Sequence, residues 1–238
     1  MSYVYFRLPH STHVFRNRLS TEPEEIASLA ELNGRRGFVI APFAPSEDCP
    51  ILLLPTEWEE VDLNFSGDNQ NGEQTHLSST DGVSAMLLDA DYEEERQRYA
   101  VDFHNYHGQL TNDAFQKIVL ARCARLTATE KLSPLTLFAR ACHRYPRMFV
   151  ALFSTERSGT WLIATPETLI SGTDGAMQTM ALAGTMRLSG ANLDFDVEGG
   201  SIGKDDIRWS TKNIKEQRYV ETYITECVEQ FSDDVNVE

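Results

Sequence analysis

Residues 148–165 read MFVALFSTERSGTWLIAT, two apolar runs separated by a short polar turn. The runs, Met148–Ser154 and Thr160–Thr165, are rich in the β-branched and aromatic residues that favour strands. The residues between them, Glu156–Gly159, are typical of a tight turn, because glycine adopts the backbone conformations that such turns need. This stretch therefore predicts an antiparallel hairpin.

A helix is predicted directly before this hairpin, at Ser133–Tyr145. Ser133 suits the N-cap position and Pro134 the first helical position, where the missing proline N–H leaves no hydrogen bond unmade. The other predicted strands are Tyr3–Leu8, Val14–Arg16, Gly37–Phe43, Ile51–Leu54, Phe115–Arg122 and Gln178–Met186. The other predicted helices are Pro23–Leu32, Asp91–Gln109 and Thr211–Phe231. Because strands mostly follow one another instead of alternating with helices, the pattern predicts an α+β protein with antiparallel sheets.

The length and charge of the chain limit its partners. The 238 residues suffice for one large domain or two small ones, and 21 Lys+Arg against 36 Asp+Glu give a net charge of −15. Such a chain repels a phosphate backbone and an anionic membrane surface, so neither nucleic acid nor membrane is an expected partner. An anionic small substrate would need local positive charge or a bound cation.

The N-terminus and the cysteines indicate a cytoplasmic protein. Residues Met1–Arg7 lack a basic segment followed by an apolar one, and no apolar stretch approaches the length of a membrane helix. The four cysteines, Cys49, Cys123, Cys142 and Cys227, form no CxxC pair, so the sequence supports neither a zinc site nor a redox motif. We expect reduced thiols, mostly packed in the core.

Between residues 64 and 84 apolar residues almost vanish, while Gly, Asn, Asp, Ser and Thr accumulate. This composition predicts a surface loop. It is equally compatible with a joint between an N-terminal sheet lobe and the part of the chain that follows.

Lys117 leads into an apolar run in FQKIVLAR, residues 115–122. In a strand its side chain would share a face with Val119, Ala121 and Cys123, because alternate residues point the same way. Burial on such a face favours the neutral amine, which can act as a base. The alternative is a lysine at a strand end whose ammonium group reaches into water.

Two glutamates are further candidates. Glu167 follows Pro166, which restrains the preceding backbone. Its carboxyl group could face Lys117 across a pocket, where one of the two groups would serve as base and the other as acid, or it could be an ordinary surface glutamate. Glu216 lies one turn before Val220 on the apolar stripe of the last predicted helix. It could hold a hard cation such as Mg²⁺ at the edge of a pocket, or be a first-turn acid that interacts with the helix dipole.

Four segments, in this order, resemble the successive signatures of the chorismate-utilising enzymes, and most closely those of isochorismate synthases. They are FQKIVLAR (115–122), TPETL (165–169), ALAGT (181–185) and KNIKEQRYV (212–220). The resemblance extends from about residue 90 to the end, and four ordered motifs are far more specific than any single one.

The resemblance implies a role for each candidate residue. Lys117 is similar to the base that activates water for attack on C2 of chorismate, and Glu167 to the acid that protonates the departing C4 hydroxyl. Glu216 is similar to one of the carboxylates that hold Mg²⁺, which in turn binds a substrate carboxylate. Gly184 and Thr185 resemble part of the substrate-binding wall. This chemistry needs no redox cofactor.

Two positions separate the chain from relatives that catalyse amination. Anthranilate synthases carry Gln where Lys117 stands, and aminodeoxychorismate synthases carry a nucleophilic lysine where Ala183 stands. Salicylate synthases share the base and the acid and then eliminate pyruvate from isochorismate, so they remain an alternative. The resemblance to isochorismate synthases favours menaquinone as the pathway served, with siderophore synthesis also open.

The resemblance also implies a fold of stacked antiparallel sheets flanked by helices, of which residues 1–238 would be the N-terminal portion of a single chorismate-binding domain. Family members are longer, and the part beyond Glu238 carries further magnesium and substrate ligands. We therefore expect the fold to be incomplete and the chain alone to make no isochorismate. Self-association, a complementing C-terminal fragment or poor stability is then expected. A remnant without catalytic activity that serves as an interaction module is the alternative from another class.

Overall fold

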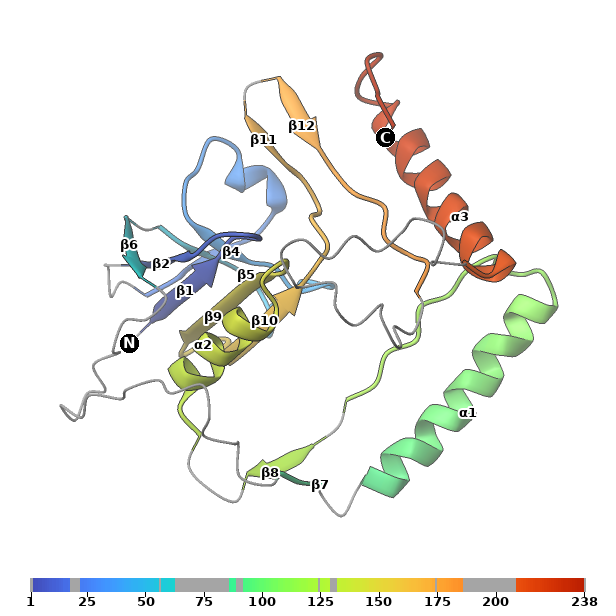
Figure 1. The fold of residues 1–238 in the computed structure, drawn as a ribbon, viewed down its shortest axis with the longest axis horizontal. Coiled ribbons are helices and arrows are strands. Elements are labelled where there is room, and N and C mark those ends of the chain that lie inside the picture. Colours follow the sequence, from blue (N-terminus) through green and yellow to red (C-terminus); the bar gives the residue numbers. More distant parts are fainter. Residues whose placement is uncertain are drawn as a thin grey trace, which may run out of the picture. The chain divides into compact units, whose positions relative to one another are not determined.

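The computed structural model describes residues 2–17, 22–55, 57–62, 86–88, 92–123, 125–128, 132–173, 175–185 and 209–237. Its helices are η1 (Leu29–Leu32, a 3₁₀ turn), α1 (Tyr92–Thr111), α2 (Pro134–Arg144) and α3 (Thr211–Val228). Its strands are β1 (Tyr3–Arg7), β2 (His13–Asn17), β3 (Glu24–Ile26), β4 (Phe38–Ile40), β5 (Ile51–Leu54), β6 (Trp58–Asp62), β7 (Met86–Leu88), β8 (Leu126–Ala128), β9 (Phe149–Thr155), β10 (Gly159–Thr165), β11 (Ser171–Thr173) and β12 (Ala176–Gln178). Figure 1 labels them along the chain.

The chain divides into two compact units. The first comprises Met1–Val101 and Ala121–Pro166, and the second comprises Asp102–Leu120 and Glu167–Glu238. All strand pairs of the described residues are antiparallel, which confirms the α+β class. The stacked-sheet fold of the family and the single domain spanning residues 1–238 stay predictions. The suggested loop or joint at 64–84 lies outside the described residues.

The first unit is built on a five-stranded sheet of order β10-β9-β1-β2-β6. The predicted hairpin is confirmed, since β9 and β10 pair along their whole length from Gly159 opposite Thr155 to Thr165 opposite Phe149. Strand β1 adds to the other edge of β9, so the N-terminal residues and the hairpin share one sheet.

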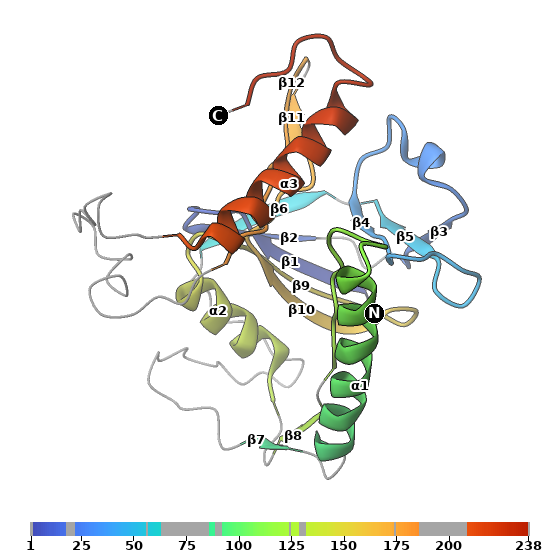
Figure 2. The ribbon, with the colours of Figure 1, turned by 90° about the vertical axis from the view of Figure 1, so that its right-hand side faces the viewer.

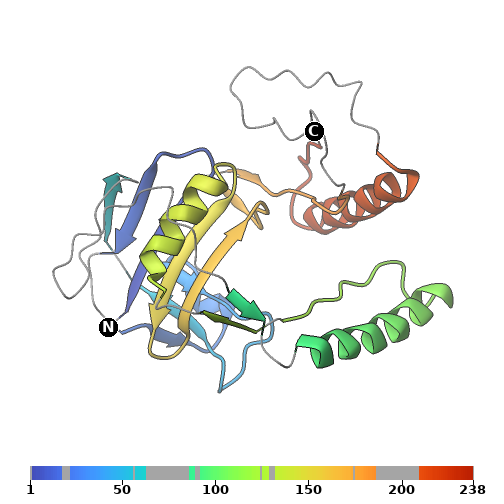
Figure 3. The same ribbon diagram turned by 60° about the horizontal axis from the view of Figure 1, so that its bottom comes forward.

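Alternation along β9 gives this sheet two buried faces. Val150 and Leu152 pack with Phe138 and Cys142 of α2, and Figure 3 shows α2 lying across the sheet. Burial raises the pKa of the Cys142 thiol to about 11, because desolvation disfavours the thiolate. Cys142 is thus packed in the core as expected, but the same expectation is wrong for Cys49 and Cys123, which are exposed.

The second sheet of this unit has the order β3-β5-β4 and is visible beside the five-stranded sheet in Figure 2. Leu54 of β5 is buried with Val4 and Phe153 of the larger sheet, and Phe38 of β4 packs against this cluster. The predicted helix at Pro23–Leu32 is wrong. Residues Glu24–Ile26 pair with β5 instead, because a short helix gains less than the burial of Ile26 against Ile51 and Leu53.

Arg7 anchors the end of α2. The side chain is only 2% exposed, and its guanidinium group donates hydrogen bonds to the carbonyl oxygens of Tyr145 (2.6 Å), Pro146 (2.9 Å) and Met148 (2.7 Å). Tyr145 is the C-cap of α2, so these bonds satisfy carbonyl groups at the helix end and in the turn that leads to β9. Among the described residues, the Nε atom of Arg7 is buried without a partner.

We expect Arg7→Met to destabilise the chain by about 3 kcal/mol or more, because three hydrogen bonds from a buried, charged guanidinium group are lost. Urea unfolding followed by circular dichroism measures the loss. Arg36→Met is the matched control, since Arg36 is exposed and its replacement should change the free energy of unfolding by less than about 0.5 kcal/mol. Equal stability of the two variants would contradict the anchoring role of Arg7.

The second unit contains the second half of α1, an extended segment after it, the β11–β12 hairpin and α3. The structure confirms the predicted helices that correspond to α1 and α3. The predicted strand at Phe115–Arg122 is wrong, because these residues are extended but unpaired among the described residues. The predicted strand at Gln178–Met186 is also largely wrong: β12 ends at Gln178, and residues 179–185 continue without strand pairing.

Candidate functional site

The end of α1 turns the chain back along the helix. Asp113 adopts a left-handed backbone conformation (φ 54°), which an aspartate tolerates better than most residues. The amide of Asp113 bonds to the carbonyl of Leu110, and the amide of Ala114 bonds to that of Gln109. These two bonds form a Schellman motif, which satisfies orphan carbonyl groups and reverses the chain direction. Residues 115–119 consequently run beside α1.

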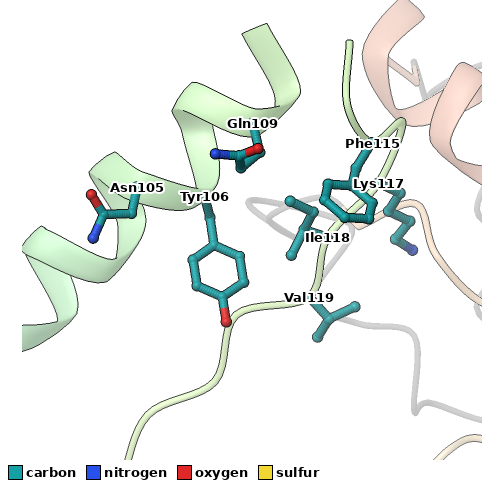
Figure 4. A pocket seen from close by; sticks show the side chains of 7 residues that line it. All are labelled: Asn105, Tyr106, Gln109, Phe115, Lys117, Ile118 and Val119. Atoms are coloured by element: carbon teal, nitrogen blue, oxygen red, sulfur yellow. The ribbon is translucent and has the colours of Figure 1, made fainter. Parts of the chain in front are cut away.

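A cavity of about 550 Å³ lies between α1 and this returning segment. Its lining is mostly apolar and consists of Asn105, Tyr106, Gln109, Phe115, Lys117, Ile118 and Val119. The volume is in the range of small-molecule sites. Figure 4 shows Tyr106 facing Ile118 and Val119 across the cavity, while the Lys117 amine points away from α1. Lys117 is the only cationic side chain in the lining.

The structure brings Lys117 and Glu216 together. The Nζ atom of Lys117 lies 3.5 Å from Oε1 of Glu216, and the two side chains are 27% and 29% exposed. Lys117 is therefore not on a strand face, and the expected burial on an apolar strand surface is wrong, since Val119 is 79% exposed. The interpretation of Glu216 as a first-turn acid is also wrong, because α3 begins at Thr211 and its first turn contains no acid.

Helix α3 also holds the ALAGT segment, through two amide side chains. Oε1 of Gln217 accepts hydrogen bonds from the amides of Ala183 (3.0 Å) and Gly184 (3.3 Å), and Nε2 of Gln217 donates to the carbonyl of Ala181 (2.7 Å). Asn213, one turn earlier, donates to the carbonyl of Thr185. These contacts place Gly184 and Thr185 beside α3, next to the helix position that carries Glu216.

Gly184 is suited to this close approach. A Cβ atom at this position would lie 3.0 Å from the carbonyl oxygen of Asn213, closer than a side chain normally comes to backbone. The start of α3 is itself fixed by Ser210, whose hydroxyl accepts a hydrogen bond from the amide of Asn213. Helix α3 thus positions both Glu216 and the ALAGT segment.

Glu167 follows Pro166 at the end of β10 and is exposed. It belongs to the second unit, like Lys117 and Glu216, but it is not among the residues that line the cavity. Of the predicted site residues, the structure joins Lys117 to Glu216, and it joins Gly184 and Thr185 to α3. The pairing of Glu167 with Lys117 as acid and base stays a prediction.

Sequence reasoning missed Tyr106 and Phe115 as cavity residues and Gln217 as the residue that holds ALAGT. A helical projection of α1 would have placed Tyr106 and Gln109 on one face, but no sequence signal says that residues 115–119 return along that face. The contacts of Gln217 with residues 181–184 are distant in sequence and have no local signature.

A magnesium site would depend on Glu216. Among the described residues, no group of three or more His, Cys, Asp or Glu side chains could hold a metal ion. Magnesium is commonly bound by one or two carboxylates, with water and substrate oxygens completing the shell. The single hard oxygen donor at Glu216 fits such a site as one ligand, and its position beside Lys117 would bring the cation next to the proposed base.

Comparison with known proteins identifies the family. Residues 56–238 match the family model described as chorismate binding enzyme, which covers more than half of the chain. The chain belongs to the chorismate-binding enzymes. No curated protein and no solved structure matches it. In the part of the chain that the structure describes, no helix is long and apolar enough to cross a membrane.

Membership of this family identifies chorismate as the small-molecule substrate and supports an enzymatic role. The matched region includes Lys117, Glu167, the ALAGT segment and Glu216, but not the strands β1 to β5 of the first unit. The residues that carry the sequence resemblance therefore all lie within the family match.

Proposed function

We propose that this protein is an isochorismate synthase, which converts chorismate to isochorismate by adding water at C2 and releasing the C4 hydroxyl. The observation that carries the proposal is the approach of Lys117 to Glu216 at 3.5 Å, next to an ALAGT segment held by α3. Lys117, Glu216 and residues 181–185, to which we assign the roles of base, metal ligand and substrate wall, come from three separate parts of the second unit.

In the proposed reaction, the neutral amine of Lys117 accepts a proton from the attacking water. The protonated carboxyl group of Glu167 gives its proton to the C4 hydroxyl, which leaves as water. Gly184 and Thr185 form the wall against which the substrate is oriented. Glu216 would be one ligand of Mg²⁺, and the ion would supply charge that offsets the substrate carboxylate. The proposed cellular role is the supply of isochorismate for menaquinone synthesis in the cytoplasm.

Two other functions remain as outcomes of the test. A salicylate synthase would use the same base and acid and would also release pyruvate. A protein without catalytic activity would bind chorismate and leave it unchanged. The amination reactions of the family are disfavoured, because position 183 is alanine instead of lysine and position 117 is lysine instead of glutamine.

The test incubates purified chain with chorismate and Mg²⁺ and identifies the products by chromatography and mass spectrometry. The assay is run with the chain alone and with the C-terminal part of a chorismate-binding enzyme added. Isochorismate is expected in the supplemented mixture. Salicylate with pyruvate would favour the second candidate, and binding of chorismate without any product in either mixture would contradict the catalytic proposal.

The magnesium role of Glu216 is tested by Glu216→Ala. Removing one hard oxygen ligand should raise the Mg²⁺ concentration needed for half-maximal chorismate binding by roughly tenfold or more. Isothermal titration of chorismate at a series of Mg²⁺ concentrations measures this shift. Glu226→Ala is the control, because Glu226 is an exposed carboxylate on the same helix. If the variant showed the same magnesium dependence as the parent, Glu216 would not be a magnesium ligand, and its role would be the ion pair with Lys117.

A further inference from the structure

Gln217 makes a three-point contact with one stretch of backbone. Its carbonyl oxygen accepts from two consecutive amides, those of Ala183 and Gly184, and its amino group donates to the carbonyl of Ala181. A primary amide carries an acceptor and a donor side by side, so it can bond to an extended backbone as a neighbouring strand would. Residues 179–185 have no strand partner in the described structure, and Gln217 takes that place.

The surroundings of Gln217 strengthen this contact. Gln217, Ala183 and Gly184 are partly buried, and buried polar groups that lose their partners cost more than exposed ones. Asn213, one turn earlier on α3, donates to a second carbonyl of the segment, that of Thr185. The amide side chains of α3 therefore fix the backbone from residue 181 to residue 185.

We propose that Gln217 is a positioning residue, which fixes the ALAGT backbone as a substrate wall in register with Glu216. Consecutive residues of α3 then serve the two sides of the site: Glu216 meets Lys117, and Gln217 meets residues 181–184. Because the same turn of α3 carries Glu216 and holds residues 181–185, the distance between the Glu216 carboxylate and this segment is fixed. The proposal rests on the proposed function in one respect, that residues 181–185 border chorismate.

The first measurement needs no substrate. Gln217→Met keeps the size of the side chain and removes all three hydrogen bonds, so amide hydrogen exchange at residues 181–185 should become roughly tenfold faster. Gln230→Met is the matched control, because Gln230 is exposed and, within the described part of the chain, its amide bonds to the carbonyl of Glu226. Unchanged exchange in Gln217→Met would overturn the proposal.

The second measurement is chorismate affinity, which Gln217→Met should weaken by roughly tenfold while Gln230→Met leaves it unchanged. Gln217→Glu is an intermediate variant. Its carboxylate still accepts hydrogen bonds from the amides of Ala183 and Gly184, but it cannot donate one to the carbonyl of Ala181. Its affinity should lie between those of the parent and Gln217→Met. Methionine is apolar and close to glutamine in size. If Gln217 served in packing alone, the chorismate affinity of Gln217→Met would equal that of the parent, and that result would overturn the proposal.

The two measurements separate this proposal from the proposed function. Faster exchange with unchanged chorismate affinity would show that Gln217 holds the segment but does not position substrate, which also overturns the proposal. A parent chain that does not bind chorismate would overturn the proposed function, and the positioning of substrate with it. The exchange data would still decide whether Gln217 holds residues 181–184. If Gln217→Met fails to fold, Gln217→Glu supplies both readouts.

Discussion

Lys117→Ala is expected to reduce isochorismate formation by roughly 10³-fold or more, while chorismate affinity changes only a few-fold. A general base acts on the water in the transition state, so its loss lowers turnover more than ground-state binding. The fold should be little affected, because the Lys117–Glu216 pair is partly exposed and such pairs contribute little to stability. Single-turnover conversion of chorismate, under the conditions that give product, measures the effect.

Lys212→Ala is the matched control, since Lys212 is an exposed lysine in the first turn of α3 and has no proposed role. Its turnover should equal that of the parent. Turnover of Lys117→Ala within about tenfold of the parent would exclude Lys117 as the base. A large loss of chorismate affinity with normal turnover would instead assign Lys117 to substrate binding.

Glu167→Gln is expected to lower turnover by roughly 10²-fold, the usual scale for loss of a general acid. Glutamine keeps the size and the polarity of the side chain but has no proton to give to the departing hydroxyl. The dependence of kcat on pH should also lose the limb that reports the acid. Steady-state rates over a range of pH values measure both effects.

The control for this variant is Glu156→Gln, in the exposed turn between β9 and β10. It should leave the rate and the pH profile unchanged. A Glu167→Gln variant with the parental rate and profile would show that the acid lies elsewhere and that Glu167 is a surface residue.

Local signals in the sequence were sufficient for α2 and the β9–β10 hairpin of the first unit, but not for Pro23–Leu32, where pairing with β5 replaced the predicted helix. Ser133 and Pro134 mark the start of α2, and the structure places a hydrogen bond from the amide of Thr136 to the Ser133 hydroxyl. The apolar runs on either side of Gly159 give the β9–β10 hairpin. In these segments the capping residues, the turn and the buried pattern all favour the same structure.

Strand predictions failed where a pairing partner was needed. Residues 115–122 have strong strand propensity, yet a strand exists only if another chain segment pairs with it, and propensity does not say whether one does. The Schellman motif at Asp113 places residues 115–119 along α1 instead. Asp113 carries no strong sequence signature of this turn, because most such positions are glycine.

The candidate site was predictable only in part, for a related reason. Residue patterns gave Lys117, Glu167 and Glu216 as candidates, and the family resemblance added Gly184 and Thr185 and implied a role for each residue. The contact of Lys117 with Glu216 and the hydrogen bonds of Gln217 depend on how α3 meets segments far away in sequence. Such contacts follow from tertiary packing, which neither periodicity nor spacing encodes.

The measurement that tests the proposed reaction most directly is conversion of chorismate in water enriched in ¹⁸O. Attack of water at C2 with loss of the C4 hydroxyl predicts isochorismate that carries one ¹⁸O atom, located in its C2 hydroxyl. Mass spectrometry detects the isotope, and nuclear magnetic resonance of the adjacent carbon locates it. Isochorismate without the isotope, or labelled at another carbon, would contradict the mechanism, and the absence of any isochorismate would contradict the proposed function.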